Sequence, residues 1–257
     1  MKSFESWDHT EIAYQEWGER TLTPPVVLHH GFVVDANSNW VATGVVDALV
    51  AAGRRVIAPD ARGHGSSEKH HDPGRYGEQL MARDLGALLE VCGESQIDLV
   101  GYSMGAIVSL IFASGEERVR GLVVGGVGSG VIECGGVDRR AVSNDAIIEA
   151  LSAEDPGTVG IPEAVAFRML ADALDADRKA LAAQAASIYR GDIPLNRISA
   201  QTLVLAGDTD PLAIRPKVLS DAIPGARLRI LSGDHIGTIA DPRFKQSIVD
   251  FLALTPE

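Results

Sequence analysis

Short apolar runs alternate with amphipathic helical patterns along most of this chain. Most of the apolar runs are unbroken stretches of valine, isoleucine and leucine, which is typical of strands buried on both faces of a sheet. Strands and helices in alternation predict an α/β protein with a mostly parallel central sheet and helices on both faces. We expect strands over Pro25–Leu28, Arg54–Pro59, Ile97–Gly101, Val119–Gly125, Thr202–Ala206 and Arg227–Leu231. We expect helices over Trp40–Ala52, Tyr76–Cys92, Ser103–Ser114 and Asp241–Leu254, and an early antiparallel strand over Thr10–Trp17.

One long segment departs from this alternation. Residues Val131–Ser199 contain helical patterns but no convincing strand, and they lie between two predicted strands. We interpret the segment as a helical cap inserted over the carboxyl edge of the sheet. Residues 1–130 and 200–257 then form the core domain, and residues 131–199 form the cap insertion.

Charge and composition exclude several classes of function. The 257 residues include 23 basic and 35 acidic residues, for a net charge of -12, and an acidic surface repels phosphate backbones and anionic lipid. We therefore expect neither nucleic-acid binding nor stable membrane association. Met1–Gly18 lacks the apolar segment of a secretory signal peptide, and Cys92 and Cys134 lack the spacing of a disulfide framework or a metal site. These features predict a cytoplasmic protein, either a monomer or a homodimer.

A candidate nucleophile lies at Gly101-Tyr102-Ser103-Met104-Gly105, which matches the pattern G-x-S-x-G. The pattern alone is weak evidence because it is short. Its context is stronger, since a predicted strand precedes Ser103 and a nearly all-apolar helix follows it. A serine on a tight strand-to-helix turn needs small neighbours so that the backbone can fold back. The alternative is a glycine-rich turn with an incidental serine.

A candidate base and its acid follow the last two predicted strands. His235 lies in the loop after Arg227–Leu231 and is the only histidine after Ser103. Asp208 and Asp210 both follow Thr202–Ala206, and a carboxylate there can accept the imidazole N–H. We favour Asp210, at the apex of the turn, and expect Asp208 to bind turn amides instead. The order serine, aspartate, histidine along the chain is the one found in α/β hydrolases.

The loop His30-Gly31-Phe32 follows the strand Pro25–Leu28 and supplies a candidate oxyanion hole. The backbone N–H groups of Phe32 and Met104 are the expected donors, and each such donor typically contributes ~10²–10³ in kcat. We interpret His30 as a structural residue that braces the loop.

The sequence resembles the capped esterase, lactonase and perhydrolase group of the α/β-hydrolase fold. The matching elements are the HGF loop, the stretch Asp60–Ser67 (DARGHGSS), the GYSMG turn, TLVLAGDTDP and the final GDH. The resemblance implies a triad of Ser103, Asp210 and His235, with oxyanion donors at Phe32 and Met104. It also implies that Asp60 and Arg62 hold a turn and that His64 is not catalytic. Serine rather than aspartate in the GYSMG turn argues against haloalkane dehalogenases and epoxide hydrolases.

These residues predict a serine hydrolase that forms an acyl-enzyme on Ser103 and needs no metal or organic cofactor. We expect a small-molecule substrate, a small or medium uncharged ester or lactone. A carbon–carbon bond hydrolase, a cofactor-free perhydrolase and a non-catalytic ligand-binding protein remain alternatives. Phe32, Met104 and Ile236 are expected to bind substrate, and Asp234 has no assigned role. Cap residues that could line the pocket are Ile132, Val165, Phe167, Arg168, Met169, Leu170, Ile188, Tyr189 and Arg190.

Overall fold

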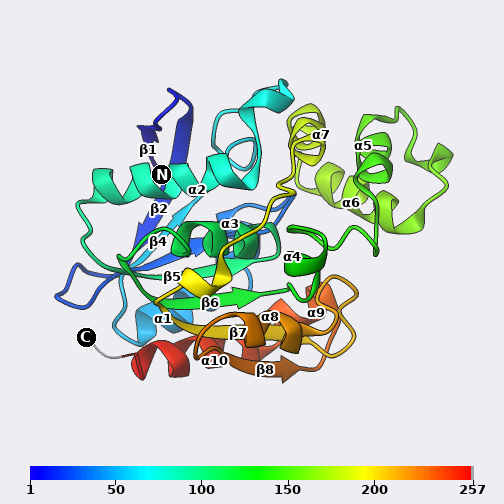
Figure 1. Cartoon of the computed structure of the whole chain (residues 1–257). Coiled ribbons are helices and arrows are strands. Elements are labelled where there is room, and N and C mark those ends of the chain that lie inside the picture. The colour runs from blue at the N-terminus through cyan, green and yellow to red at the C-terminus, as the bar shows by residue number, and fades with distance from the viewer. Residues whose placement is uncertain (256–257) are drawn as a thin grey trace.

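The structure is a computed structural model that describes residues 1–255. Within these residues, eight strands form one sheet in the order β1-β2-β4-β3-β5-β6-β7-β8 (Figure 1). Strands β3 to β8 run parallel, whereas β1 and β2 are antiparallel to their neighbours, so the prediction of a mostly parallel sheet is confirmed. The strands are β1 (Lys2–Glu5), β2 (Glu11–Trp17), β3 (Val26–His29), β4 (Val56–Pro59), β5 (Ile97–Tyr102), β6 (Val119–Gly125), β7 (Gln201–Gly207) and β8 (Arg227–Leu231).

Helices cover both faces of this sheet. Helices α2 (Glu78–Cys92), α3 (Met104–Ala113) and α8 (Pro216–Ala222) pack on one face, and α1 (Val45–Ala51) and α10 (Pro242–Ala253) pack on the other. The strands contribute side chains to the apolar cores on both faces of the sheet, because alternate side chains point to opposite faces. In β5, for example, Leu99 belongs to the core beneath α2, α3 and α8, and Val100 belongs to the core beneath α1 and α10. The fold is therefore α/β with three layers, as the alternation of patterns predicted.

The helix expected over Trp40–Ala52 is wrong in its extent. A π-helical turn at Asn37–Val41 precedes α1, and Gly44 between them has a φ of +73°. A residue in the left-handed region cannot continue a right-handed helix, so the apolar spacing spans two separate elements. Sequence patterns also did not indicate β1, where only Phe4 is buried, or the short helices α8 and α9 (His235–Ala240).

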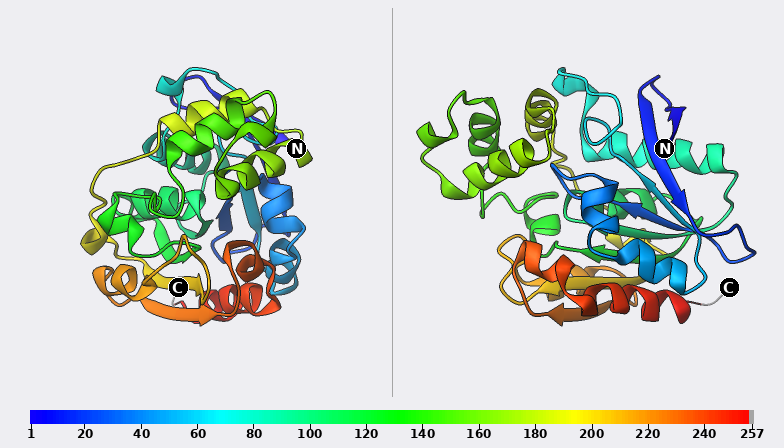
Figure 2. Two further views of the ribbon diagram at one scale, coloured as in Figure 1. Left: turned by 90° about the vertical axis from the view of Figure 1, so that its right-hand side faces the viewer. Right: turned by 180° about the vertical axis from the view of Figure 1, so that it is seen from behind.

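Residues 131–199 are helical where they are regular, and no strand occurs within this range. Figures 1 and 2 show α5 (Asn144–Ser152), α6 (Pro162–Ala173) and α7 (Arg178–Ala186) as a group at the end of the molecule toward which the parallel strands point. These helices share a core of their own, to which Val33, from the loop after β3, also belongs. The short helix α4 (Gly130–Glu133) leads into the group. That this group acts as a cap over the sheet edge stays a prediction.

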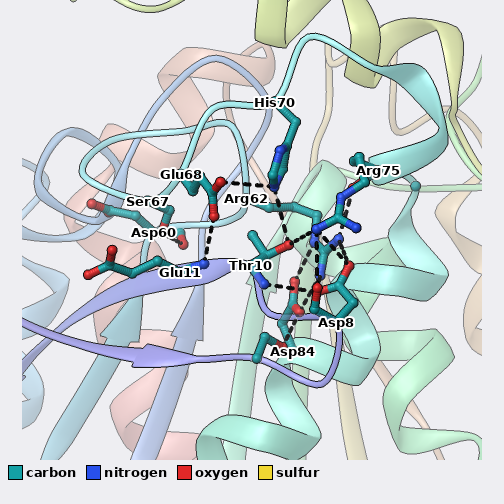
Figure 3. Close-up of polar contacts among 12 residues, drawn as sticks. Asp8, Thr10, Glu11, Asp60, Arg62, Ser67, Glu68, His70, Arg75 and Asp84 are labelled. Atoms are coloured by element: carbon teal, nitrogen blue, oxygen red, sulfur yellow. Dashed lines mark hydrogen bonds and ion pairs between the residues drawn. The ribbon is translucent and has the colours of Figure 1, made fainter.

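The loop after β4 is held by a buried cluster of ion pairs (Figure 3). The Arg62 guanidinium is fully buried and donates to Asp84 at 2.6 and 2.8 Å and to Asp8 at 2.9 Å. Burial acts to raise the pKa of Asp8, but hydrogen bonds from Arg62 and Thr10 outweigh it and lower that pKa to about 2. The Asp60 carboxylate accepts the amide of Ser66, within the loop, at 2.8 Å and that of Ala36, in the segment after β3, at 3.0 Å. These contacts give the loop a structural role.

Three buried histidines pack against one another: His64 lies in the same loop, and His29 and His30 are consecutive residues at the end of β3. The rings of His29 and His30 have centroids 5.8 Å apart, and those of His30 and His64 are 5.2 Å apart. Burial, together with the neighbouring His30, lowers the pKa values of His29 and His64 to about 3. All three imidazoles are therefore neutral at physiological pH, so this region of the core depends on their deprotonated forms.

Acid should destabilise the fold through these histidines. The unfolded chain binds a proton on each near pH 6.5, whereas the folded chain does so only near pH 3, so falling pH favours unfolding across that window. Each histidine should cost about 2 kcal/mol of unfolding free energy between pH 7 and pH 5. The free energy of unfolding, measured by urea denaturation, should therefore fall between pH 7 and pH 5 by about 2 kcal/mol less in His29→Gln than in the wild type. His9→Asn, which changes an exposed histidine, is the control. Equal pH dependence in all three proteins would contradict the burial of a neutral imidazole.

Candidate active site

Ser103 lies on a strained turn between β5 and α3. Its φ of 55° and ψ of -118° are unusual for any residue with a side chain. A Cβ on Gly101 would lie 2.2 Å from the carbonyl oxygen of Gly105, and a Cβ on Gly105 would lie 2.0 Å from that of His29. Real Cβ atoms do not approach oxygen so closely, so the turn requires glycine on both sides of the serine. Strain of this kind is common at active sites.

His235 and Asp210 are in direct contact. The His235 Nδ1 atom donates to Asp210 Oδ2 at 2.8 Å, because a carboxylate can only accept. The side chain of Asp210 is fully buried, and its Oδ1 accepts the amide of Leu212 at 2.8 Å. Asp208 instead accepts the amide of Gly233 at 2.9 Å. Of the two aspartates considered from sequence, Asp210 is the one that contacts the imidazole.

The ring of His235 is held against the strand that leads to Ser103. Its centroid lies 5.2 Å from that of Tyr102, whose hydroxyl donates to the backbone carbonyl of His235 at 2.5 Å. On another side, a Cβ on Gly126 would lie 2.9 Å from His235 Cε1. Within residues 1–255, the Ser103 hydroxyl makes no hydrogen bond to His235. Catalytic hydrogen bonds are often long before substrate binds, so this does not argue against their working together.

Asp234, which had no role from sequence, is the N-cap of α9. Its Oδ1 accepts the amides of Ile236 at 3.2 Å and Gly237 at 2.7 Å. The carboxylate therefore fixes the start of the helix that begins at His235. The same helix turns Ile236 outward, and its side chain is 64% exposed. Ile236 does not line the cavity described below, so the expectation that it binds substrate is not supported.

Two backbone amides near Ser103 have no acceptor within the described residues. They belong to Phe32 and Met104, the expected oxyanion donors. Met104 is the first residue of α3, and the first N–H groups of a helix have no partner inside it. The loop that carries Phe32 is fixed on one side by the Gly31 amide, which donates to Asn39 at 2.9 Å. On the other side, Val33 has a φ of +73°, a rare conformation for a β-branched residue.

A cavity opens at Ser103. Phe32 and Met104 line it, as expected, together with Phe167 and Ile188 of residues 131–199. The other cap residues proposed from sequence do not line it, and Arg168 instead donates to backbone carbonyls of the α5 region. The remaining lining residues are Glu78, Val137, Val142, Asn144, Ile147, Gln184, Ala185 and Leu212. Sequence patterns did not indicate the polar members, because each lies on a helix that gave no sign of facing a cavity.

The described part of the chain offers no grouping of side chains for a metal ion. Among residues 1–255, no three histidine, cysteine, aspartate or glutamate side chains are grouped as a metal site would require. No helix in that range combines the length and apolar character needed to cross a membrane.

Comparisons with known proteins agree with this architecture. A family model described as the alpha/beta hydrolase fold matches residues 24–131. The non-heme chloroperoxidase CPO-A1 of Kitasatospora aureofaciens is 28% identical over 276 residues, covering 95% of this chain and 97% of the relative. A solved hydrolase from Pseudomonas aeruginosa superposes with a TM-score of 0.80 at 26% identity, covering 98% of this chain and 97% of its own. A thermophilic esterase from Thermogutta terrifontis has a TM-score of 0.76 at 26% identity, with the same coverage.

The close packing around the turn predicts that Gly101→Ala is strongly destabilising. The added methyl would overlap the Gly105 carbonyl, so the free energy of unfolding should fall by about 3 kcal/mol or more. Gly115→Ala is the matched control, because no atom lies within 4 Å of the position that its methyl would occupy. It should leave stability unchanged or raise it by up to about 1 kcal/mol. Urea denaturation of both variants tests this, and equal stabilities would contradict the turn geometry.

The contact between His235 and Asp210 predicts a strongly deshielded Nδ1 proton in the NMR spectrum. Asp210→Asn should remove this signal or move it far upfield, because a neutral amide is a weaker acceptor than a carboxylate. Asp208→Asn is the matched control and should leave the signal in place, since Asp208 binds a turn amide. Loss of the signal in Asp208→Asn alone would show that the pairing belongs to the other aspartate.

Proposed function

We propose that this chain, whose fold is that of the α/β hydrolases, is a serine hydrolase acting on a small or medium uncharged carboxylic ester or lactone. The observation that carries the proposal is Ser103 on its strained turn at a mostly apolar cavity, where the preceding Tyr102 packs against an imidazole that donates to a buried carboxylate. The fold supplies this arrangement at the carboxyl edge of the sheet, where ligands of such sheets bind.

In the first half of the reaction, His235 removes the Ser103 proton as Oγ attacks the carbonyl carbon of the substrate. Asp210 keeps the proton on Nδ1, so Nε2 is free to act as the base, and the carboxylate stabilises the imidazolium that forms. The amides of Phe32 and Met104 donate to the oxygen that becomes negative. His235 then gives its proton to the leaving alcohol, and an acyl-enzyme remains on Ser103.

In the second half, water takes the place of the alcohol. His235 removes a proton from the water, which attacks the acyl carbon, and the acid leaves as the proton returns to Ser103. In a lactone the alcohol and the acid belong to one product, and the same steps open the ring. Residues 131–199 act as a cap in this proposal, because Phe167 and Ile188 cover the cavity from that side.

The apolar lining supports an uncharged substrate. Val137, Val142, Ile147, Phe167 and Leu212 offer no partner for a charged group, and burying an unpaired ion is very costly. This lining fits the alkyl or aryl portion of an ester.

A second candidate is cofactor-free perhydrolysis, favoured by the likeness to a chloroperoxidase over 95% of this chain. In that reaction hydrogen peroxide rather than water attacks the acyl-enzyme, and a peracid leaves instead of an acid. The two activities share Ser103 and differ only in the second nucleophile.

Ser103→Ala should abolish ester hydrolysis. Without the nucleophile no acyl-enzyme forms, so kcat for a p-nitrophenyl ester should fall by about 10³-fold or more. Ser114→Ala, at the other end of the same helix, is the matched control and should keep its rate. Labelling with a fluorophosphonate probe should follow the same pattern. Hydrolysis by Ser103→Ala at nearly the wild-type rate would overturn the assignment.

The same wild-type protein can be tested against the other reactions. Peroxide-dependent halogenation much faster than ester hydrolysis would favour the perhydrolase, and rapid cleavage of a vinylogous diketone would favour a carbon–carbon bond hydrolase. A correctly folded protein that neither labels nor turns over any of these substrates would point to a ligand-binding protein.

A further inference from the structure

The cavity at Ser103 contains one carboxyl group that the proposed mechanism does not use. Glu78, the first residue of α2, lines the cavity although only 1% of its surface is exposed. Its Oε2 accepts the amide of Tyr189 at 2.5 Å. No lysine, arginine or histidine pairs with it among residues 1–255, and burial raises its pKa above the usual range. A buried acid without a counter-charge is costly and needs an explanation.

Two buried side-chain amides, those of Gln184 and Asn144, line the same cavity as Glu78. Gln184 is 1% exposed and Asn144 is 8% exposed, and both line the cavity. The Gly77 amide, next to Glu78, donates to Gln184 Oε1 at 3.3 Å. The Asn144 Nδ2 atom donates at 2.8 Å to the carbonyl of Ala185, the residue after Gln184. Backbone groups thus link the neighbourhoods of the three side chains, and all three line the same cavity; they are here called the polar wall.

Each member of the polar wall keeps hydrogen-bonding capacity that the protein does not use. Gln184 Nε2 has only a weak contact, 4.0 Å from the sulfur of Met104. Asn144 Oδ1 accepts no hydrogen bond from the residues described. Glu78 has a second oxygen with no side-chain partner in the same range. The wall therefore offers an amide donor, an amide acceptor and a carboxyl group to whatever fills the cavity.

We propose that the polar wall of Glu78, Gln184 and Asn144 recognises a hydroxyl group on the substrate, away from the bond that is cleaved. This inference rests on the proposed hydrolase function and narrows its substrate class to hydroxylated esters or lactones. A hydroxyl has one donor and two acceptor lone pairs. It can accept from Gln184 Nε2 and donate to Asn144 Oδ1, and it can form a further hydrogen bond with the carboxyl group of Glu78.

Charged groups match the wall less well. A substrate carboxylate would meet the acid of Glu78 and find no cation. A substrate ammonium would have to leave water for a cavity lined by Phe32, Phe167 and Leu212, and one oxygen of Glu78 is already bonded to Tyr189. A neutral hydroxyl avoids both costs.

The wall also lies close to the reacting centre. Gln184 contacts the side chain of Met104, the residue after the nucleophile, so the two regions meet on one side of the cavity. A substrate held at Ser103 can therefore reach the wall with its remaining length.

The test compares isosteric substrates in one protein preparation. The p-nitrophenyl ω-hydroxyalkanoates with chains of six to eight carbons are paired with the esters in which methyl replaces the hydroxyl. A second pair, (hydroxymethyl)phenyl and ethylphenyl acetate, places the hydroxyl on the leaving group. Wild type should favour the hydroxylated member of at least one pair by about tenfold or more in kcat/KM, because the methyl analogue leaves buried polar groups unpaired. This ratio is independent of the fraction of protein that is folded.

Substitutions then assign the preference to the wall. Glu78→Met and Gln184→Met should reduce it to about threefold or less, since each removes a polar partner. Glu78→Gln should keep most of it, because an amide can still accept from Tyr189 and donate to the hydroxyl. Glu163→Met, which removes an exposed carboxylate from the first turn of α6, is the matched control and should keep the wild-type ratio.

The possible results separate this inference from the proposed function. If wild type cleaves none of the esters, the hydrolase proposal fails. Cleavage of all pairs without a preference for hydroxyl would overturn the polar wall and leave the hydrolase proposal standing. A stronger preference for the ω-aminohexanoate ester, lost in Glu78→Gln, would also overturn it, because the wall would then bind a cation through an ionised Glu78.

Discussion

The close contact between the first turn of α3 and the strands β3 and β5 is the constraint on which the rest of the site depends. Gly105 lies where any side chain would meet the carbonyl of His29, and Gly101 lies where one would meet Gly105. This contact forces Ser103 into its unusual backbone conformation. It also places Met104 at the start of α3, where its amide has no partner inside the helix. One packing contact therefore sets the positions of both the proposed nucleophile and a proposed oxyanion donor.

Close packing around Val33 stabilises a second residue with an unusual backbone conformation near Ser103. Val33, next to the oxyanion loop residue Phe32, is in the left-handed region and yet buried among Val142, Ile147 and Leu181 of residues 131–199. The second strained loop thus shares a core with the helices that cover the cavity. A displacement of these helices would change the packing that holds the loop. In the proposed mechanism, substrate selection and oxyanion stabilisation are linked through this shared core.

Much of the fold was predictable because buried parallel strands and covering helices leave strong patterns. The sheet, its main helices and the turn at Ser103 follow from apolar runs and glycines. The choice of Asp210 over Asp208 also followed from its place in the turn, and the contact with His235 agrees with it. The pocket was less predictable. Ile236 was expected to bind substrate. Asp234 is instead the N-cap of α9, and this helix turns the Ile236 side chain to solvent.

The polar residues of the cavity show why such sites resist prediction from sequence. Glu78 and Gln184 lie on amphipathic helices, where a polar residue is ordinarily assigned to the solvent face. Both are instead buried because α2 and α7 meet at the cavity and turn these positions inward. Burial of uncompensated polar groups lowers stability, and proteins accept such costs mainly at functional sites. The groups proposed to react come from the sheet edge, whose geometry local sequence encodes. The groups proposed to select a substrate come from helices whose mutual placement only the tertiary structure determines.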